Sequence, residues 1–555
     1  MSADFPWWSR RRFLAGMTLG GTAAALGWRR GAAQVAPDEL TGCDFDLVIG
    51  ARSVDFGGGH RRATVVNGHL PAPVLRWREG DTVTLRVRNT LAEPSSIHWH
   101  GILLPAGMDG VPGLSFAGIA PGATYTYRFR VRQAGTYWYH SHSRFQEQIG
   151  LYGAIVIEPR DGERWRCERD YVVLLSDWPD TDPERIYATL KKQSNYYNFG
   201  QPTLAEFLRD ARAEGVAAAL AGRRMWNRMR MDPSDLADVS AHAYRYLLNG
   251  ATPQANWTGR FAPGERVRLR FVNAAAMTFF DVRIPGLGLT VIAADGQDVA
   301  PVEIEEFRIA PAETYDVVVT PAEARAYAIF AQAMDRSGFA SGTLAPRDGM
   351  RAAVPPLDPR PRLAMADMMG ESMSHAAMKG MEGSCGAMRS AAPGPAVDMV
   401  VSTPRRNLDD PGVGLRDHGR RVLTYADLRT PGPPIAAAVD REIVLRLTGN
   451  MQRYVWSFDG RKFSAAEPLR LGLGERVRVR LINDTMMSHP IHLHGMWSEL
   501  ESADGEFQVR KHTVVVQPAQ SVSFRVCADA PGHWAFHCHL LYHMESGMFR
   551  EVVVA

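Results

Sequence analysis

Residues 80–89 read Gly-Asp-Thr-Val-Thr-Leu-Arg-Val-Arg-Asn, residues 264–273 read Gly-Glu-Arg-Val-Arg-Leu-Arg-Phe-Val-Asn, and residues 474–483 read Gly-Glu-Arg-Val-Arg-Val-Arg-Leu-Ile-Asn. Each copy begins with a glycine-acid turn, alternates apolar and polar residues, and ends at asparagine. A period of two predicts a strand with one face in a core and the other in water. Because the pattern occurs three times, we expect three related modules.

A second element follows each copy. Pro121 precedes alternating aromatic residues and leads to His140, and Pro518 leads in the same way to His537, each step being 19 residues. The middle copy runs from Pro311 to Phe330, so that phenylalanine occupies the histidine position. Short strands with turn signals and no alternating helices are typical of Greek-key sandwiches. We therefore expect an all-β chain of three Greek-key β-sandwich domains, the middle one without metal ligands.

Two segments depart from the strand pattern. Residues 181–240 contain helix-like runs, such as that from Leu204 to Ala221, and predict a helical insertion. Residues 346–400 are rich in proline, glycine, methionine and serine, which predicts a methionine-rich linker or insert. The expected division is a signal peptide at 1–36, domain 1 at 37–160, domain 2 at 161–345 with its insertion at about 181–240, the insert at 346–400, and domain 3 at 401–555.

The N-terminus has the pattern of an export signal. Arg10, Arg11 and Arg12 precede an apolar run that ends near Trp28, and small residues follow it. This order predicts the twin-arginine pathway and a periplasmic protein. The alternative is a basic tail before a membrane anchor, but glycine and threonine interrupt the run and it is short for a span. We expect no stable membrane anchor, and a net charge of +3 argues against a nucleic-acid partner.

Ten of the 17 histidines fall into four short motifs. Cys538 lies between His537 and His539, with His543 and Met548 after it, and these are the ligand types of a blue-copper site. Side chains alternate along a strand, so the two histidines beside the cysteine face away from its site and require a second one. Three further motifs supply partners: His98-Trp99-His100, His140-Ser141-His142 and His489-Pro490-Ile491-His492-Leu493-His494. We predict no disulfide among the other four cysteines.

These motifs, in this order, resemble the multicopper oxidases from about residue 40 to the C-terminus, and are most similar to periplasmic copper-resistance proteins of the CopA/PcoA type. The resemblance implies cupredoxin-like domains and four copper ions. It implies type 1 copper ligands His489, Cys538, His543 and Met548; type 2 ligands His98 and His492; and type 3 ligands His100, His140, His142, His494, His537 and His539. It also implies that Asp109, in a Met-Asp-Gly-Val-Pro-Gly stretch, relays protons near the type 2 site. The alternative for Asp109 is an ordinary turn aspartate before glycine.

Methionine is unusually frequent, with 23 residues. Thioether sulfur binds Cu(I) without deprotonation, so the cluster in the insert predicts additional Cu(I) capture. The methionines concerned are Met365, Met368, Met369, Met373, Met378, Met381 and Met388, with Met487 beside the type 1 histidine as a further candidate. The alternative is packing, by a short amphipathic helix in the insert and by apolar cover around His489.

The sequence is compatible with three functions. The first is an enzyme of copper resistance that oxidises Cu(I) to Cu(II), and small phenols as well, at the type 1 copper and reduces O2 to water at a trinuclear cluster. The second is a general laccase-like phenol oxidase. The third is a periplasmic protein that sequesters copper without turnover. Cu(I), O2 and small phenols are the expected reactants, and other periplasmic copper-resistance proteins the expected partners.

Overall fold

The computed structural model describes residues 38–370, 394, 396–432 and 438–555. The expected signal peptide at 1–36 lies outside these residues. So do four of the methionines expected to capture copper: Met373, Met378, Met381 and Met388. No helix within the described residues is both long enough and apolar enough to cross a membrane.

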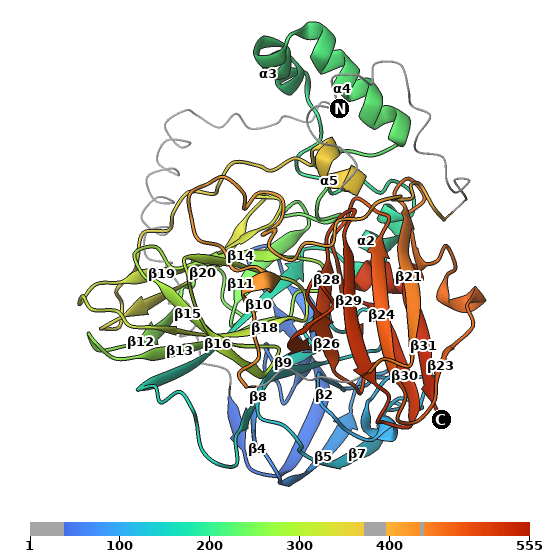
Figure 1. Cartoon of the computed structure of the whole chain (residues 1–555). Helices are drawn as coiled ribbons and strands as arrows, with labels where there is room; N and C mark the ends of the chain where they lie inside the picture. Colours follow the sequence, from blue (N-terminus) through green and yellow to red (C-terminus); the bar gives the residue numbers. More distant parts are fainter. Residues whose placement is uncertain (1–37, 371–393, 395, 433–437) are drawn as a thin grey trace, which may run out of the picture. The chain divides into compact units, whose positions relative to one another are not determined.

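Six sheets form three sandwiches, one after another along the chain (Figure 1). The first sandwich pairs a sheet in the order β1-β4-β9-β8-β6 with one in the order β3-β2-β5-β7. Its elements are β1 (Glu39–Thr41), β2 (Asp44–Val54), β3 (Arg61–Val66), β4 (Val74–Arg78), β5 (Thr82–Asn89), β6 (His98–His100), η1 (Ala106–Met108), β7 (Thr124–Arg130), β8 (Gly135–His140) and β9 (Tyr152–Glu158).

The second sandwich has sheets in the orders β11-β10-β13-β18-β15-β16 and β12-β20-β19-β14-β17. Its strands are β10 (Arg169–Pro179), β11 (Tyr244–Leu248), β12 (Trp257–Arg260), β13 (Val267–Asn273), β14 (Phe280–Arg283), β15 (Leu289–Ala294), β16 (Gln297–Ile304), β17 (Glu306–Ile309), β18 (Thr314–Val319), β19 (Tyr327–Ala333) and β20 (Phe339–Ala345). Phe330 is buried in β19 opposite Arg283, where the related strands of the other sandwiches carry histidine.

The third sandwich has sheets in the orders β22-β21-β24-β29-β26-β27 and β23-β31-β30-β25-β28. Its elements are β21 (Arg441–Asn450), β22 (Val455–Phe458), η5 (Phe463–Ala465), β23 (Leu469–Leu471), β24 (Arg476–Asn483), β25 (His489–Leu493), β26 (Ser498–Glu501), β27 (Phe507–Lys511), β28 (Thr513–Val516), β29 (Ser521–Cys527), β30 (Gly532–Cys538), α7 (Leu541–Ser546) and β31 (Phe549–Val554). Two short helices precede it, α5 (Met365–Met369) and η4 (Tyr425–Asp427).

The three copies of the sequence repeat occupy equivalent positions. They form β5, β13 and β24, and each pairs in parallel with one neighbour (β2, β10 or β21) and antiparallel with another (β7, β18 or β29). The asparagine that ends each copy is fully buried, and its side-chain amide donates to two backbone carbonyls. The repeat therefore reflects one architecture built three times. The expected water-exposed face is wrong for β13, because Arg268 and Arg270 on that face are buried.

The helical insertion lies in the second sandwich, between β10 and β11. It contains α2 (Pro183–Leu190), α3 (Leu204–Glu214) and α4 (Val216–Met229), and Figure 1 shows α3 and α4 beyond the ends of the strands. Thr203 and Glu206 form a capping box at the start of α3. Gly215, with φ of 91°, separates α3 from α4, so the helix-like run from Leu204 to Ala221 is two helices.

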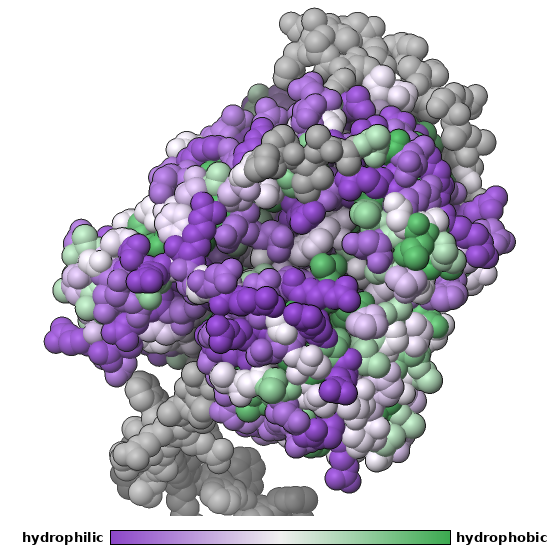
Figure 2. Space-filling view, turned by 60° about the horizontal axis from the view of Figure 1, so that its bottom comes forward, coloured by the Kyte–Doolittle hydropathy of each residue, from purple (hydrophilic) through white to green (hydrophobic). Residues whose placement is uncertain are grey.

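The ligand-bearing strands of the first and third sandwiches lie in matching places. In the first, β6 pairs with β8, which sets His98 opposite His140. In the third, β25 pairs with β30, which sets His492 opposite His537. All four side chains are buried. The face of the molecule in Figure 2 is mostly hydrophilic, and its hydrophobic residues lie in small groups.

Candidate metal centres

The first candidate centre surrounds Cys538 at the end of β30. His489, which begins β25, places Nδ1 3.5 Å from the Cys538 sulfur. His543 on α7 places Nδ1 3.9 Å from that sulfur and 3.2 Å from Nδ1 of His489. Met548 follows α7 and is fully buried, and its backbone carbonyl accepts the backbone N–H of Cys538 (3.1 Å). The four residues expected at a type 1 site thus come from one sandwich and lie together.

The outer nitrogens of the two histidines are held by hydrogen bonds. Nε2 of His489 lies 2.7 Å from the Thr485 hydroxyl. Nε2 of His543 lies 2.6 Å from a carboxylate oxygen of Asp238, which comes from the second sandwich. With both Nε2 atoms occupied, Nδ1 of each ring faces the thiol. The result is a closed set of one sulfur and two nitrogen donors.

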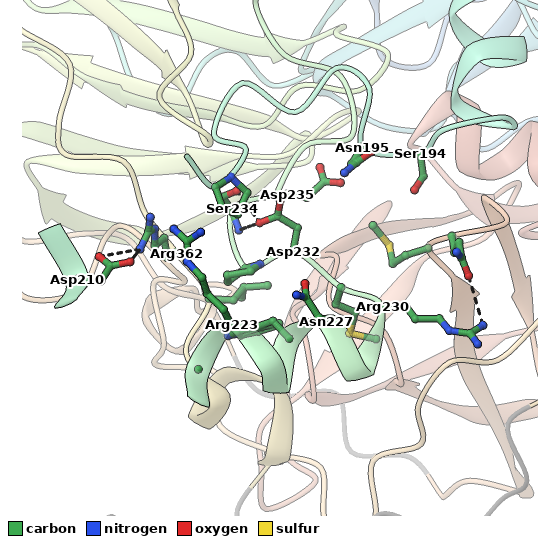
Figure 3. A pocket seen from close by; sticks show the side chains of 18 of the residues that line it. Ser194, Asn195, Asp210, Arg223, Asn227, Arg230, Asp232, Ser234, Asp235 and Arg362 are labelled. Atoms are coloured by element: carbon green, nitrogen blue, oxygen red, sulfur yellow. Dashed lines mark hydrogen bonds and ion pairs between the residues drawn. The ribbon is translucent and has the colours of Figure 1, made fainter. Parts of the chain in front are cut away.

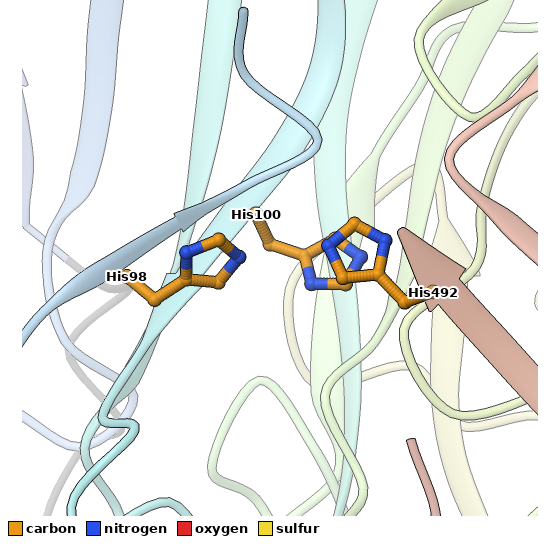
Figure 4. A group of neighbouring side chains, drawn as sticks. All are labelled: His98, His100 and His492. Atoms are coloured by element: carbon orange, nitrogen blue, oxygen red, sulfur yellow. The ribbon is translucent and has the colours of Figure 1, made fainter. Parts of the chain in front are cut away.

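The second candidate centre consists of eight histidines between the first and third sandwiches. Six of them form two triads whose donor atoms lie within 4.8 Å of one another: His100, His140 and His539; and His142, His494 and His537. Each triad takes residues from both sandwiches. His98 and His492 complete the group, and their rings lie beside that of His100 (Figure 4). None of the His, Cys, Asp and Glu groupings among the described residues falls in the second sandwich.

The hydrogen bonds of these histidines leave nitrogens free at the centre. His98 Nδ1 lies 2.8 Å from the Asp109 carbonyl, and His492 Nδ1 lies 2.6 Å from the His512 carbonyl. His140 Nδ1 contacts the Glu147 carboxylate at 2.6 Å. The opposite nitrogen, Nε2, of all three histidines is buried without a hydrogen-bond partner. Buried polar atoms rarely stay unpaired, so these donors fit a group of metal ions between them.

The electrostatics also suit metal ligands. Burial lowers the pKa of His140, His494 and His539 well below the usual value. Burial lowers the pKa of His537 to about 4. Neutral imidazoles keep a lone pair for a metal, and cationic ones do not. Burial raises the pKa of the Cys538 thiol, so metal binding there must release a proton.

Cys538 connects the two centres. Its neighbours His537 and His539 belong to different triads, while its own side chain faces His489 and His543. The strand alternation predicted this separation, since residues on either side of a strand position face the other way. The shortest covalent connection between the centres is therefore the backbone of residues 537–539.

Asp109 lies inside the second centre. It follows η1 in a turn before Gly110, as the turn interpretation expects. Its carboxylate also approaches two of the centre's histidines, at 2.8 Å from His494 Nδ1 and 3.2 Å from His98 Nδ1. The side chain is buried. The turn thus places a carboxylate against two expected copper ligands.

Three residues at the centres were not expected from the sequence: Asp238, Glu147 and His512. Glu147 follows the His140-Ser141-His142 motif closely, which is a weak signal that sequence analysis could have used. Asp238 and His512 had no such signal, because they reach the centres from segments without a metal-ligand motif.

A cavity of about 920 Å³ opens beside the first centre, between α3, α4 and the third sandwich. Figure 3 shows Asp232 and Asp235 on the side opposite α4. Met231 and Met451 also line it. Burial and the neighbouring Asp238 carboxylate raise the pKa of the Asp235 carboxyl, so the two residues are close together. A short path of contacts therefore leads from the cavity through Asp235 and Asp238 to His543.

The described methionines of the insert divide between exposed and packed positions. Met365, at the start of α5, is partly exposed, whereas Met368 is buried in the core. Met487, beside the first centre, is also buried, at 2% exposure. The packing alternative describes Met368 and Met487 well.

Sequence comparison identifies the family. Models described as multicopper oxidase match residues 49–162, 169–348 and 437–555. Copper resistance protein A of Escherichia coli is 54% identical over 600 aligned positions, covering 98% of this chain and 99% of that protein. The copper resistance protein A homolog of Pseudomonas syringae pv. tomato is also 54% identical, with the same coverage of both chains.

Comparison with solved structures supports the fold. The laccase of Botrytis aclada superposes with a TM-score of 0.63 at 21% identity, covering 94% of this chain and 88% of that one. Three cupredoxin-like sandwiches with a helical segment in the second are thus confirmed.

Proposed function

Because this chain belongs to the multicopper oxidase family, whose members are oxidoreductases that use O2, we propose that it oxidises Cu(I) to Cu(II) in copper resistance. The observation that carries the proposal is the position of Cys538. It lies in a site with two histidines, and its neighbours His537 and His539 belong to two separate histidine triads. A site suited to single electrons is thus joined covalently to a site suited to several metal ions.

The candidate ligands fall into one set for each copper ion. We assign His489, Cys538, His543 and Met548 to the type 1 copper; His98 and His492 to the type 2 copper; His100, His140 and His539 to one type 3 copper; and His142, His494 and His537 to the other.

When bound, the four copper ions supply one-electron transfer at the type 1 site and the four-electron reduction of O2 to water at the other three. The chain holds neutral imidazoles in fixed orientations and excludes water from them. The backbone between Cys538 and its two neighbours provides the path between the sites. Asp109, buried against His98 and His494, would relay protons near the site where O2 would react.

The cavity beside the first centre supports Cu(I) as the reductant. Met231 and Met451 line it, and thioethers are ligands that suit Cu(I). Asp235 also lines it and connects through Asp238 to His543. A cation held in the cavity would therefore lie within a short chain of contacts from the type 1 site.

The methionine-rich insert supports capture of further Cu(I). In sequence, Met365, Met369 and the four methionines at 373–388 would supply further thioethers. Arg362, a residue of the insert just before α5, lines the cavity and pairs with Asp210 of α3. Met368 and Met487 have less part in this capture, because both are buried.

The N-terminal sequence supports a periplasmic location. Arg10, Arg11 and Arg12 and the apolar run after them form a twin-arginine signal, and that pathway suits a protein that acquires its cofactor before export. Other periplasmic copper-resistance proteins are the expected partners.

Oxygen uptake by the copper-loaded protein tests the proposal. It should proceed with Cu(I) as reductant, and should weaken at low Cu(I) concentration when residues 371–390 are deleted, a change that leaves α5 intact. A bulky phenol does not bind through thioethers, so the intact protein and the deletion variant should oxidise it at equal rates.

Two other outcomes would select the alternatives. Rapid phenol oxidation combined with Cu(I) oxidation that the deletion leaves unchanged would favour a general laccase-like oxidase, for which a cavity of about 920 Å³ offers room. Binding of extra copper without any oxygen uptake would favour a sequestering protein.

A further inference from the structure

The second sandwich carries none of the assigned copper ligands, yet one of its carboxylates holds a segment that contacts two of them. Asp295 follows β15 and is fully buried. Its Oδ2 accepts the backbone N–H groups of His512 (3.2 Å) and Thr513 (3.1 Å), at the junction of β27 and β28. Its Oδ1 accepts the N–H of Thr314 in its own sandwich (3.0 Å). The carboxylate therefore bridges the second and third sandwiches.

A buried lysine reinforces the bridge. Lys511 Nζ lies 3.0 Å from Asp295 and 3.0 Å from Glu313, and all three side chains are almost completely buried. Tyr315 and Tyr425 flank the ammonium group at 5.2 Å and 5.1 Å. Buried charges persist only when they are paired, so this cluster fixes the segment around Lys511.

That segment touches two assigned copper ligands. The carbonyl of His512 accepts from Nδ1 of His492 (2.6 Å). The hydroxyl of Thr513 lies 3.3 Å from Nε2 of His100. The two rings are thus held at different nitrogens. The free nitrogen is Nε2 in His492 and Nδ1 in His100, and both are buried without a hydrogen-bond partner.

Peptide geometry links these contacts. The carbonyl of His512 and the N–H of Thr513 belong to one planar trans peptide, so they point in opposite directions. Asp295 holds the N–H side and His492 meets the carbonyl side. Rotation of this peptide would break both contacts at once. The orientation of the His492 ring therefore depends on a carboxylate that never touches it.

We propose that Asp295 is a positioning residue that determines, from the second sandwich, which ring nitrogens of His492 and His100 face the trinuclear site. The inference rests on the ligand assignment of the proposed function. It gives the second sandwich, which has no copper ligands, a direct part in assembling the oxygen-reducing centre. Hydrogen-bond partners behind metal-bound histidines fix ring orientation, and their loss costs about 10- to 100-fold in metal affinity or activity.

The variant Asp295→Asn tests this in the full-length protein reconstituted with copper. The neutral side-chain amide of asparagine cannot form an ion pair with Lys511. Its oxygen is also a weaker acceptor than a carboxylate for the two backbone N–H groups. We expect the blue type 1 absorption to persist. The type 2 signal in electron paramagnetic resonance should change or disappear, copper content should fall from four ions toward three, and oxygen uptake should fall about 10- to 100-fold.

The matched control is Asp281→Asn. Asp281 is also fully buried in the second sandwich and paired with arginines, Arg308 and Arg336, but contacts no assigned ligand. It should lose thermal stability and keep a normal type 2 signal. If Asp295→Asn does not fold, Asp295→Glu preserves the charge for Lys511 while displacing the amide contacts, and the same spectral change is expected.

Thr513→Val probes the second contact separately. It removes the hydroxyl beside His100 and keeps the N–H bound by Asp295, so the type 2 signal should remain while the type 3 pair is lost or altered. A normal type 2 signal with four bound ions in both Asp295 variants would overturn the inference. Because the readouts are copper content and spectra, this result is separable from a failure of Cu(I) oxidation.

Discussion

The carboxylate of Asp238 lies 2.6 Å from Nε2 of His543, although the two residues are 305 positions apart in the chain. Tyr454 donates to the same carboxylate oxygen (3.0 Å), and all three side chains are buried. The second sandwich, without ligands of its own, thus supports both candidate centres: Asp238 contacts His543 directly, and Asp295 holds the segment that contacts His492 and His100.

Asp238→Asn should raise the reduction potential of the type 1 site. A carboxylate that accepts the His543 N–H makes the ring a stronger donor to Cu(II), and a neutral amide does so less. The blue absorption should remain, and a redox titration of that band should show the upward shift. Asp235→Asn is the matched control, because Asp235 contacts Asp238 and not His543. An unchanged potential in Asp238→Asn would contradict the prediction.

Cys538→Ser should abolish the blue colour and oxygen uptake while leaving three copper ions bound. A hydroxyl replaces the thiolate with little change in volume, so β30 should keep His537 and His539 in place. Absorption, copper analysis and oxygen uptake measure the three effects. Cys527→Ser, in β29 and outside every candidate ligand group, should match the unaltered protein. Persistent turnover in Cys538→Ser would show that electrons reach the cluster by another path.

The copper-free protein should lose stability as the pH falls below about 6.5. Burial lowers the folded-state pKa of His140, His494 and His539, and lowers that of His537 to about 4, so between these values the unfolded chain binds protons that the folded chain does not. Stability therefore rises with pH in this window, by about 1.4 kcal/mol per unit for each such group. Melting temperatures at pH 7 and pH 5 measure the effect.

Copper loading is the control for that experiment. Bound metal competes with protons for the same nitrogens, so the loaded protein should lose less stability between pH 7 and pH 5. Equal losses in the two forms would mean that the acid sensitivity comes from other groups.

Local patterns predicted more of this protein than long-range contacts did. The repeated strands were predictable because alternation reports burial within a few residues, and the ligands because their motifs are short. Asp238 and Asp295 were not, since each acts through a fold-dependent contact with another sandwich. Met368 shows the same limit: composition could not separate a methionine that packs from one that remains exposed.

The asparagine that ends each repeat offers a comparison within one chain. The Asn273 amide donates to the carbonyls of Thr278 and Ile309, and the Asn483 amide to those of Met487 and Val516. Each side-chain oxygen also accepts a backbone N–H two residues later. The two asparagines thus share three hydrogen bonds in different sandwiches, and Asn483 also accepts a fourth from the Thr485 hydroxyl.

Asn273→Ala should therefore lower the free energy of unfolding by about 3 kcal/mol for three buried hydrogen bonds, and Asn483→Ala by about 4 kcal/mol, because it also loses the bond from the Thr485 hydroxyl. Their effects on copper should differ. Thr485, whose hydroxyl binds both Asn483 and His489 Nε2, loses its anchor only in Asn483→Ala, so only that variant should shift the blue absorption. Chemical denaturation of the copper-free variants gives the first quantity and spectra of the loaded ones the second. A shifted blue band in Asn273→Ala would mean that general loosening, rather than the Thr485 contact, controls the His489 ring.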